Sequence, residues 1–403
     1  MRTVLSNLLL LGSLGAQTVH LVGPGGFPEL DPAIAAASPG DILRVAPGAY
    51  TAFTLDKALT IEALPGGEVG IYGFVSTTRL RPPAGSTATI SRLHFRNPWT
   101  RYVSMSTRIE RGTVFCEDCL FEGPPNQGFA ALTVDNATAV LRGCALVGNG
   151  IAAQTSGWEN DGMLCNNAAV FATDCWFRGS DTMFDSYGSG GDGVQASGSL
   201  VHLVRCRVEG GVQRGCLANP PGRGIALVGT SRLWLADSTV IGGDAICNLG
   251  AVGGIGLQNG TAVAVQLARS TITGGAGTPN PAPAITGPTA TAPLLGLGAA
   301  SPAVLLGGTF TITYQTEPNW PIVVLLDGDL ARRNDPRVAQ PVLLASSAPV
   351  VLGLLFGDPS GNAVYQTNLP NVPTLRGARL FVAAVSGLSL PLQTSPPLGG
   401  IAR

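Results

Sequence analysis

Apolar and polar residues alternate in a pattern that occurs six times up to and including Gly274, with a weaker copy in front that begins near Ala88. Each copy has apolar residues five and three positions before a reference residue, another two positions after it, and glycine four positions after it. The reference residues, spaced by 25, 31, 31, 32 and 32 residues, are Cys119, Cys144, Cys175, Cys206, Ser238 and Ser270. A fixed period of this length indicates a stack of similar structural units.

Within each copy, the alternation is that of short β-strands. The reference residue lies an odd step from the preceding apolar position, so the chain is expected to bend there and begin another strand. One coil of two or three strands cannot bury its apolar side alone, but stacked coils share a core. The pattern therefore predicts an all-β fold, a right-handed parallel β-helix. An up-and-down barrel is the alternative, but it would not need one residue type in each slot of every coil.

The chain is expected to divide into a signal segment and two domains. Residues 1–17 contain Arg2, an apolar run and small residues behind it, which predicts a secretory signal peptide. The β-helix is expected over 18–275. Within it, 28–38 predicts a short helix that caps the first coil.

A second domain is expected behind the β-helix. Residues 276–293 are rich in Pro, Gly, Thr and Ala and predict a linker. Residues 294–403 predict a small antiparallel β-sandwich. Its expected strands, divided by turn-forming residues, include 310–314, 322–326, 350–356, 362–366 and 379–385.

The repeat pattern resembles that of the pectin-lyase-like superfamily of right-handed β-helices. Residues 31–67 are similar to the opening of pectin methylesterases, and Gly48 and Tyr50 match the start of the esterase G-x-Y-x-E motif. Ala52 replaces its glutamate, and the catalytic esterase and polygalacturonase motifs have no counterpart here. The resemblance implies the fold and not esterase activity. Residues 361–403 are similar to C-terminal β-sandwich modules of exported bacterial proteins, which implies a role in export or in attachment to the cell envelope.

Composition narrows the functional classes. Charged residues make up 12% of the chain and the net charge is −1, so neither nucleic acid nor an anionic membrane is an expected partner. No transmembrane helix is expected in the mature chain, which is predicted to be secreted or held at the cell surface. The eight cysteines suit an oxidising compartment. Those in the reference slot are expected as buried thiols, and Cys216 and Cys247, one coil apart in loops, are the predicted disulfide.

A row of charged residues is the first candidate site. Asp161, Asp192 and Arg223 each precede a glycine that opens a coil, at spacings of 31 and 31 residues. They should fall at one place on three neighbouring coils. Two carboxylates so close require a bridging cation, an arginine or a raised pKa. Calcium at Asp161 and Asp192, or acid/base catalysis by the row, are the functional hypotheses. The alternative is two turns, with Arg223 paired to Asp192.

The outward side of the last strand in each coil is the second candidate. Trp176, Arg178 and Arg207 should lie together there, with Trp158 and Tyr187 in adjacent loops. An exposed tryptophan beside arginines suits an acidic polysaccharide, through stacking and forked contacts to carboxylates. The alternative is an ordinary strand face with an ion pair between Arg178 and Glu209 across coils.

Two functional hypotheses follow. The first is an exported protein that binds or processes an extracellular, acidic polysaccharide; if it is an enzyme, a polysaccharide lyase or another carbohydrate-active type is expected. The second is a non-catalytic cell-surface protein, such as an adhesin, that uses the β-helix as a rigid display scaffold. The three histidines are too far apart in coil position for a Ser-His-Asp triad or a His-based metal site.

Overall fold

Three long parallel sheets form the first compact unit of the chain, Val19–Ala84 and Ala88–Thr291, in a computed structural model. The structure describes residues 17–401 except 74–75, 97–105, 125–128, 149–159, 183–188, 215–219, 247–251, 279–280, 293–295, 301–305, 329, 331–337, 339–343, 345–348, 370, 372–378, 391 and 396. The predicted signal peptide therefore lies almost wholly outside the described residues.

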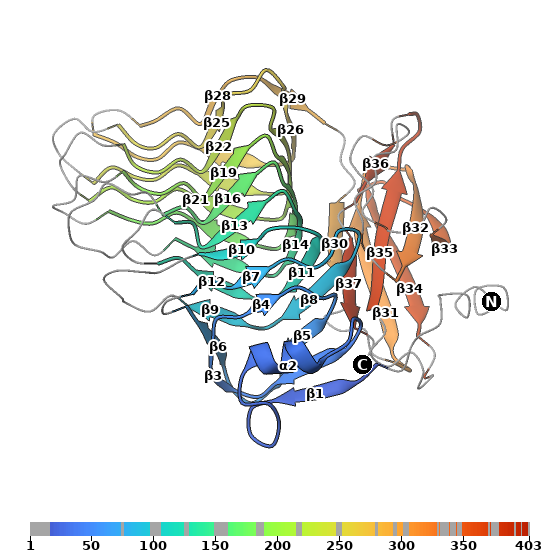
Figure 1. Ribbon diagram of the computed structural model, residues 1–403. Coiled ribbons are helices and arrows are strands. Elements are labelled where there is room, and N and C mark those ends of the chain that lie inside the picture. Colours follow the sequence, from blue (N-terminus) through green and yellow to red (C-terminus); the bar gives the residue numbers. More distant parts are fainter. Residues whose placement is uncertain are drawn as a thin grey trace. The chain divides into compact units, whose positions relative to one another are not determined.

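Each coil contributes one strand to each sheet, and neighbouring strands are parallel (Figure 1). Sheet A runs through β1 (Val19–Val22), β2 (Ile42–Val45), β5 (Thr60–Ala63), β8 (Thr87–Ser91), β11 (Thr113–Glu117), β14 (Thr138–Arg142), β17 (Ala169–Thr173), β20 (Leu200–Val204), β23 (Arg232–Ala236), β26 (Val265–Ala268) and β29 (Thr289–Thr291). Sheet B runs through β3 (Gly48–Thr51), β6 (Val69–Tyr72), β9 (His94–Arg96), β12 (Leu120–Glu122), β15 (Ala145–Val147), β18 (Trp176–Arg178), β21 (Arg207–Glu209), β24 (Thr239–Ile241) and β27 (Thr271–Thr273).

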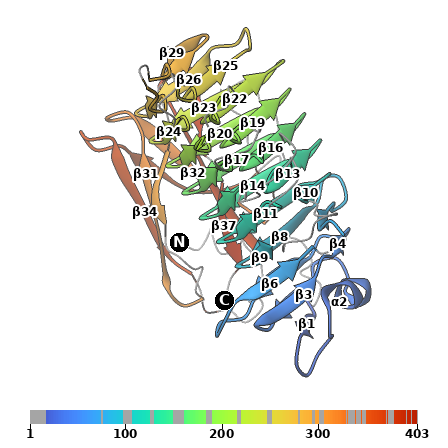
Figure 2. The same ribbon diagram turned by 90° about the vertical axis from the view of Figure 1, so that its left-hand side faces the viewer.

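Sheet C completes the coils. It runs through β4 (Thr54–Leu55), β7 (Arg79–Leu80), β10 (Thr107–Ile109), β13 (Leu132–Asp135), β16 (Met163–Asn166), β19 (Val194–Ser197), β22 (Ile225–Val228), β25 (Leu257–Asn259) and β28 (Ile285–Thr286). The stack of successive coils is seen from its side in Figure 2. This is the predicted right-handed parallel β-helix. Residues 276–293, expected as a linker, instead include β28 and β29, which pair with β25 and β26 and extend the solenoid by part of a coil.

The alternating apolar positions meet in one continuous core between the sheets. Val114 and Cys116 on β11 and Phe121 on β12 are fully buried, as the alternation predicts. Phe121 stacks on Phe95 of the preceding coil, with ring centroids 4.7 Å apart. Identical slots on successive coils thus place similar side chains on top of one another.

The N-terminal end of the stack is covered by α2 (Leu30–Ala36), as the predicted capping helix requires (Figure 1). Leu30, Ala33 and Ile34 of this helix join the core. Lys57 donates from Nζ to three carbonyl oxygens at the end of the helix, at 2.8–2.9 Å. The ammonium group thereby supplies hydrogen bonds to carbonyl oxygens that have no N–H partner within the helix, and its positive charge complements the helix dipole. Among the described residues, no helix combines the length and apolar character needed to cross a bilayer.

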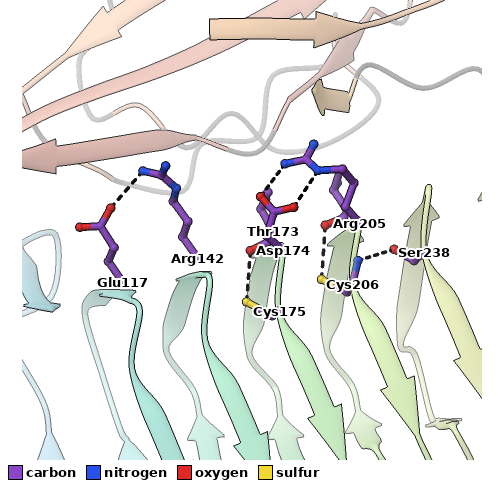
Figure 3. A network of polar contacts seen from close by, with 9 residues as sticks. Glu117, Arg142, Thr173, Asp174, Cys175, Arg205, Cys206 and Ser238 are labelled. Carbon is purple, nitrogen blue, oxygen red and sulfur yellow. Dashed lines mark hydrogen bonds and ion pairs between the residues drawn. The ribbon is translucent and has the colours of Figure 1, made fainter. Parts of the chain in front are cut away.

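The bend before each reference residue is made by one residue with left-handed backbone torsions. Asp118, Asp174, Arg205 and Asp237 have φ between 46° and 55°, and the same slot of another coil holds Gly143. Side chains at this corner pair between coils: Arg205 donates to both oxygens of Asp174, at 2.7 and 2.6 Å (Figure 3). Such pairing offsets part of the strain of a left-handed residue other than glycine.

The reference cysteines lie directly behind these corners and point into the core. Cys119, Cys144, Cys175 and Cys206 are free thiols with at most 2% of their surface exposed. Each thiol donates to a backbone carbonyl; Cys175 bonds to Thr173 at 3.3 Å (Figure 3). Burial raises the pKa of the Cys119 and Cys175 thiols, so these groups stay protonated and unreactive.

The recurring glycine marks the place where the outgoing and returning segments of a loop touch. An added Cβ at Gly179 would lie 1.8 Å from the carbonyl oxygen of Gly191, and one at Gly210 would lie 2.1 Å from that of Gly222. Neither glycine has a positive φ, so glycine is not needed here for a left-handed turn. It is needed because two backbone segments approach too closely for any side chain.

A zigzag of backbone hydrogen bonds runs through these loop bases from coil to coil, and we call it the glycine neck. The N–H of each member of the neck after the first donates to the carbonyl oxygen of the member before it, with N–O distances of 2.7–3.0 Å. In this order the members are Asn160, Ser180, Gly191, Gly211, Gly222, Gly243, Gly254 and Gly275. The neck replaces a sheet where the strands have ended.

The second unit is formed mainly by Ala292–Arg403 and contains two antiparallel sheets. One consists of β30 (Gly296–Ala300), β31 (Thr309–Gln315) and β34 (Asn362–Asn368). The other consists of β33 (Val350–Phe356), β32 (Pro321–Asp327), β35 (Arg379–Ser386), β36 (Gln393–Thr394) and β37 (Leu398–Ile401). Residues from both sheets share one core, in which Ile312 and Tyr314 of β31 meet Ile322 and Val324 of β32. This is the predicted β-sandwich.

Candidate functional site

Asp161, Asp192 and Arg223 lie at one place on three neighbouring coils, directly behind the glycine neck. The backbone N–H of Asp192 donates to Oδ1 of Asp161 at 2.8 Å, and that of Arg223 donates to Oδ1 of Asp192 at 2.8 Å. The register expected from the spacing of 31 residues is therefore present. The carboxylates continue the hydrogen bonding of the neck at the point where sheet C begins.

The positive charge beside Asp192 comes from Arg223. Its Nε lies 3.0 Å from both oxygens of Asp192, and its Nη2 donates to Oδ2 at 2.6 Å. Asp192 is 2% exposed, and Arg223 is held further by a bond from Nη1 to Gln258. Both oxygens of Asp192 are thus engaged by the guanidinium of Arg223, which is the alternative pairing expected for this row; calcium at Asp161 and Asp192 stays a prediction. Among the described residues, no group of three or more His, Cys, Asp or Glu side chains is placed to hold a metal.

Trp176, Arg178 and Arg207 lie together on the outward face of sheet B. Trp176 is in register with Arg207 on the next coil. The tryptophan is 37% exposed, and its indole N–H donates to Oε2 of Glu209 at 3.0 Å. The side chain of Arg207 is 60% exposed and forks onto Oε1 of the same glutamate. Glu209 therefore orients an aromatic face and a guanidinium side by side.

Arg178 has a different partner from the one its register suggests. It is the register neighbour of Glu209, so a cross-coil ion pair between the two was the alternative interpretation of this face. Instead, Nη2 of Arg178 donates to Asp181 at 2.9 Å, three residues along the chain, and Arg214 approaches the same carboxylate at 3.3 Å. The predicted pairing of Arg178 with Glu209 is wrong, because a local carboxylate competes for Arg178 and Glu209 is occupied by Arg207.

Four predicted site residues lie outside the described part of the chain. Trp158 and Tyr187, expected to flank the tryptophan face, fall in the loop segments 149–159 and 183–188. Cys216 and Cys247, the predicted disulfide, fall in 215–219 and 247–251. Their roles stay predictions.

A second polar cluster on sheet B was not recognised from the sequence. His94 lies between two carboxylates, 2.9 Å from Glu68 through Nδ1 and 3.2 Å from Glu122 through Nε2. The repeat places His94 and Glu122 in outward slots, but Glu68 belongs to the coil before the recognised copies. There the corner between β5 and β6 is lengthened, which hides the period. Aligning Glu68, the acidic residue that precedes β6, with the strand of the next coil in sheet B would have predicted this cluster.

Comparisons with known proteins concern the fold alone. No protein-family model and no curated protein matches the sequence. Among solved structures, pectate lyase Pel9A is similar over 69% of this chain and 79% of its own, with 13% identity and a TM-score of 0.40. The enzymatically active domain of tailspike protein 2 from bacteriophage CBA120 is similar over 86% of this chain and 69% of its own, with 9% identity and a TM-score of 0.27. The β-helix of this chain is given by its own three sheets, and these likenesses add no residue to the site.

Proposed function

We propose that this protein binds an acidic polysaccharide on the outward face of sheet B, with Trp176 and Arg207 as the main contacts. The observation that carries the proposal is their register: an exposed indole and an exposed guanidinium lie on adjacent coils and share Glu209. An indole face stacks on the apolar face of a sugar ring, and a guanidinium forks onto a sugar carboxylate.

The charge of this face supports an anionic ligand. Arg178, Arg207 and Arg214 supply three guanidinium groups, and Asp181 and Glu209 supply two carboxylates, which leaves one net positive charge. The two carboxylates hold the arginines in place before a ligand arrives. Preorganised donors lose less side-chain entropy on binding, so even a modest net charge favours the anion.

Binding is proposed rather than cleavage because the carboxylates of the charged row have structural partners. Asp161 and Asp192 are at most 7% exposed, and each accepts a backbone N–H of the next coil. Burial in that hydrogen-bond ladder supports a role in holding the loop bases. We place the binding outside the cell, in line with the apolar N-terminal segment, and we propose that the C-terminal β-sandwich attaches the protein to the cell envelope.

The experiment is calorimetric titration of the purified chain with oligogalacturonate at low ionic strength. We expect Trp176→Ala and Arg207→Ala each to weaken binding by about fivefold to tenfold, since one such contact contributes about 1 kcal/mol. Val228→Ala, an exposed apolar residue on sheet C, and Arg44→Ala, an exposed arginine paired with Glu62 on sheet A, are the matched controls. Equal affinities for the parent and both sheet B variants would contradict the proposal, and no binding at all would favour the display scaffold.

A further inference from the structure

The cluster around His94 lies on the same face of sheet B as Trp176. Arg96 completes it: its guanidinium lies 3.5 Å from Glu68 and 3.4 Å from Glu122, and its Nε lies 3.1 Å from Nε2 of His94. The two carboxylates are thus separated and held by a histidine and an arginine. Every member of the cluster has a partner before any ligand binds.

The exposed atoms of this cluster belong to its charged residues. The side chain of His94 is 10% exposed, whereas those of Glu68, Glu122 and Arg96 are 49%, 33% and 39% exposed. His94 therefore holds the two glutamates, and the glutamates and Arg96 face outward. The hydrogen bond from His94 keeps the pKa of Glu122 below its ordinary value, and Arg96 acts in the same direction. Glu122 is thus an ionised acceptor throughout the neutral range.

The charge here is opposite to that around Trp176. Two carboxylates face one guanidinium, so the cluster carries one net negative charge when His94 is neutral and none when it is protonated. A sugar carboxylate is not attracted in either state. Sugar hydroxyl groups, by contrast, donate to ionised carboxylates and accept from a guanidinium, and these charge-assisted hydrogen bonds are the strong ones.

The two clusters are aligned along the stack. His94, Leu120, Ala145 and Trp176 occupy one column of successive coils in sheet B. Three steps between neighbouring strands separate His94 from Trp176, a distance of roughly 14 Å. Leu120 and Ala145 between them are half-buried and uncharged, so in the part of the chain that the structure describes this column carries no charge between the two clusters.

We propose that Glu68, Arg96 and Glu122 form a second subsite, which accepts a neutral sugar unit of the same chain whose acidic unit lies at Trp176 and Arg207. This inference rests on the proposed function and narrows it. The ligand class is then a heteropolysaccharide that mixes acidic and neutral units, not a polymer in which every unit carries a carboxylate.

The test compares two octasaccharides by calorimetry at pH 7 and fixed ionic strength. One is from hyaluronate, in which acidic and neutral units alternate, and the other is octagalacturonate, in which every unit is acidic. We expect the hyaluronate octasaccharide to bind about tenfold more tightly. Arg96→Ala should weaken its binding about tenfold, whereas Glu122→Gln should strengthen octagalacturonate binding by removing a repelling charge.

Controls separate this inference from the proposal that it extends. Glu62→Gln, a carboxylate paired with Arg44 on sheet A, should change neither affinity. If Glu122→Gln does not fold, Glu68→Gln, at a more exposed position, tests the same repulsion. Equal affinity for the two octasaccharides, unchanged by Arg96→Ala and Glu122→Gln but lowered by Trp176→Ala, overturns the second subsite alone. Affinities that are also unchanged by Trp176→Ala overturn the proposed function.

Discussion

The glycine neck offers the sharpest test of how the coils are held together. Gly211 lies in the middle of the zigzag: its N–H donates to the carbonyl of Gly191 at 2.8 Å, and its own carbonyl accepts from Gly222 at 3.0 Å. All three residues are buried. We therefore expect Gly211→Ala to destabilise the β-helix far more than an ordinary glycine substitution does.

The magnitude follows from the space at that position. An alanine Cβ would lie 1.7 Å from the carbonyl oxygen of Ser180, while real Cβ atoms essentially never come closer than 3.0 Å. The neighbouring segments would have to separate by the difference, 1.3 Å, which breaks both hydrogen bonds of Gly211. A buried backbone group left without a partner costs about 1–3 kcal/mol. The expected loss in the free energy of unfolding is therefore about 2–6 kcal/mol.

Urea unfolding followed by far-ultraviolet circular dichroism measures this loss. Gly229→Ala is the matched control, because its φ of +67° strains an alanine while the nearest atom is 3.6 Å away. A left-handed alanine costs only about 1 kcal/mol. The reasoning is refuted if Gly211→Ala unfolds at the same urea concentration as Gly229→Ala, since steric contact at the neck would then carry no penalty beyond backbone strain.

Three further predictions concern charge and thiols. Asp192→Asn should lower the free energy of unfolding in urea by about 2 kcal/mol, since it removes the carboxylate that Arg223 binds. Calcium should leave the parent's melting temperature unchanged; a calcium-dependent rise would contradict this and support the predicted metal role. Glu122 has a lowered pKa when folded, so its stabilisation is complete above its ordinary pKa of 4.5 and is lost as the pH falls through the folded pKa. Glu122→Gln should therefore lower the melting temperature at pH 7 and less at pH 3; an equal loss at both would contradict this. Thiol titration in denaturant should find six thiols before reduction and eight after, given six free described cysteines and the predicted Cys216–Cys247 disulfide; eight at once would exclude it.

The fold could be predicted because its determinants repeat. Alternation around Cys119 and Cys175 places apolar side chains inward in every coil, and the structure confirms the resulting core. The strands of sheet C were harder to predict from the sequence, since each follows a loop of variable length. The expected linker at 276–293 was misjudged for a similar reason: its Pro and Gly content resembles a turn region, yet β28 and β29 need only two or three residues each to pair with the preceding coil.

The candidate site could be predicted only in part. The repeat places residues on the same row, but which charged side chains pair depends on the distances between them in the folded chain. Spacing placed Asp161, Asp192 and Arg223 on one row, but it could not distinguish an arginine from a calcium ion as the neutralising charge. The alternative pairing of Arg178 with Glu209 was wrong for the same reason, since Asp181, three residues along the chain, binds the guanidinium of Arg178 instead. Glu68 was missed because the long corner before β6 shifts it out of the period.

The positions that repeat and the positions that vary have different physical roles in this stack. Slots that repeat serve the stack itself: the small reference residue fits the core, the left-handed residue turns the corner, and glycine lets the loop segments meet. The outward column of sheet B imposes no such demand, and it holds His94, Leu120, Ala145, Trp176, Arg207 and Thr239 in succession. Side chains in this column can therefore vary without disturbing the stack, which leaves them available to contact a ligand. The row behind the neck cannot vary in this way, because Asp161 and Asp192 extend a backbone hydrogen-bond ladder. This difference supports the proposal that sheet B recognises the ligand while the neck holds the coils together.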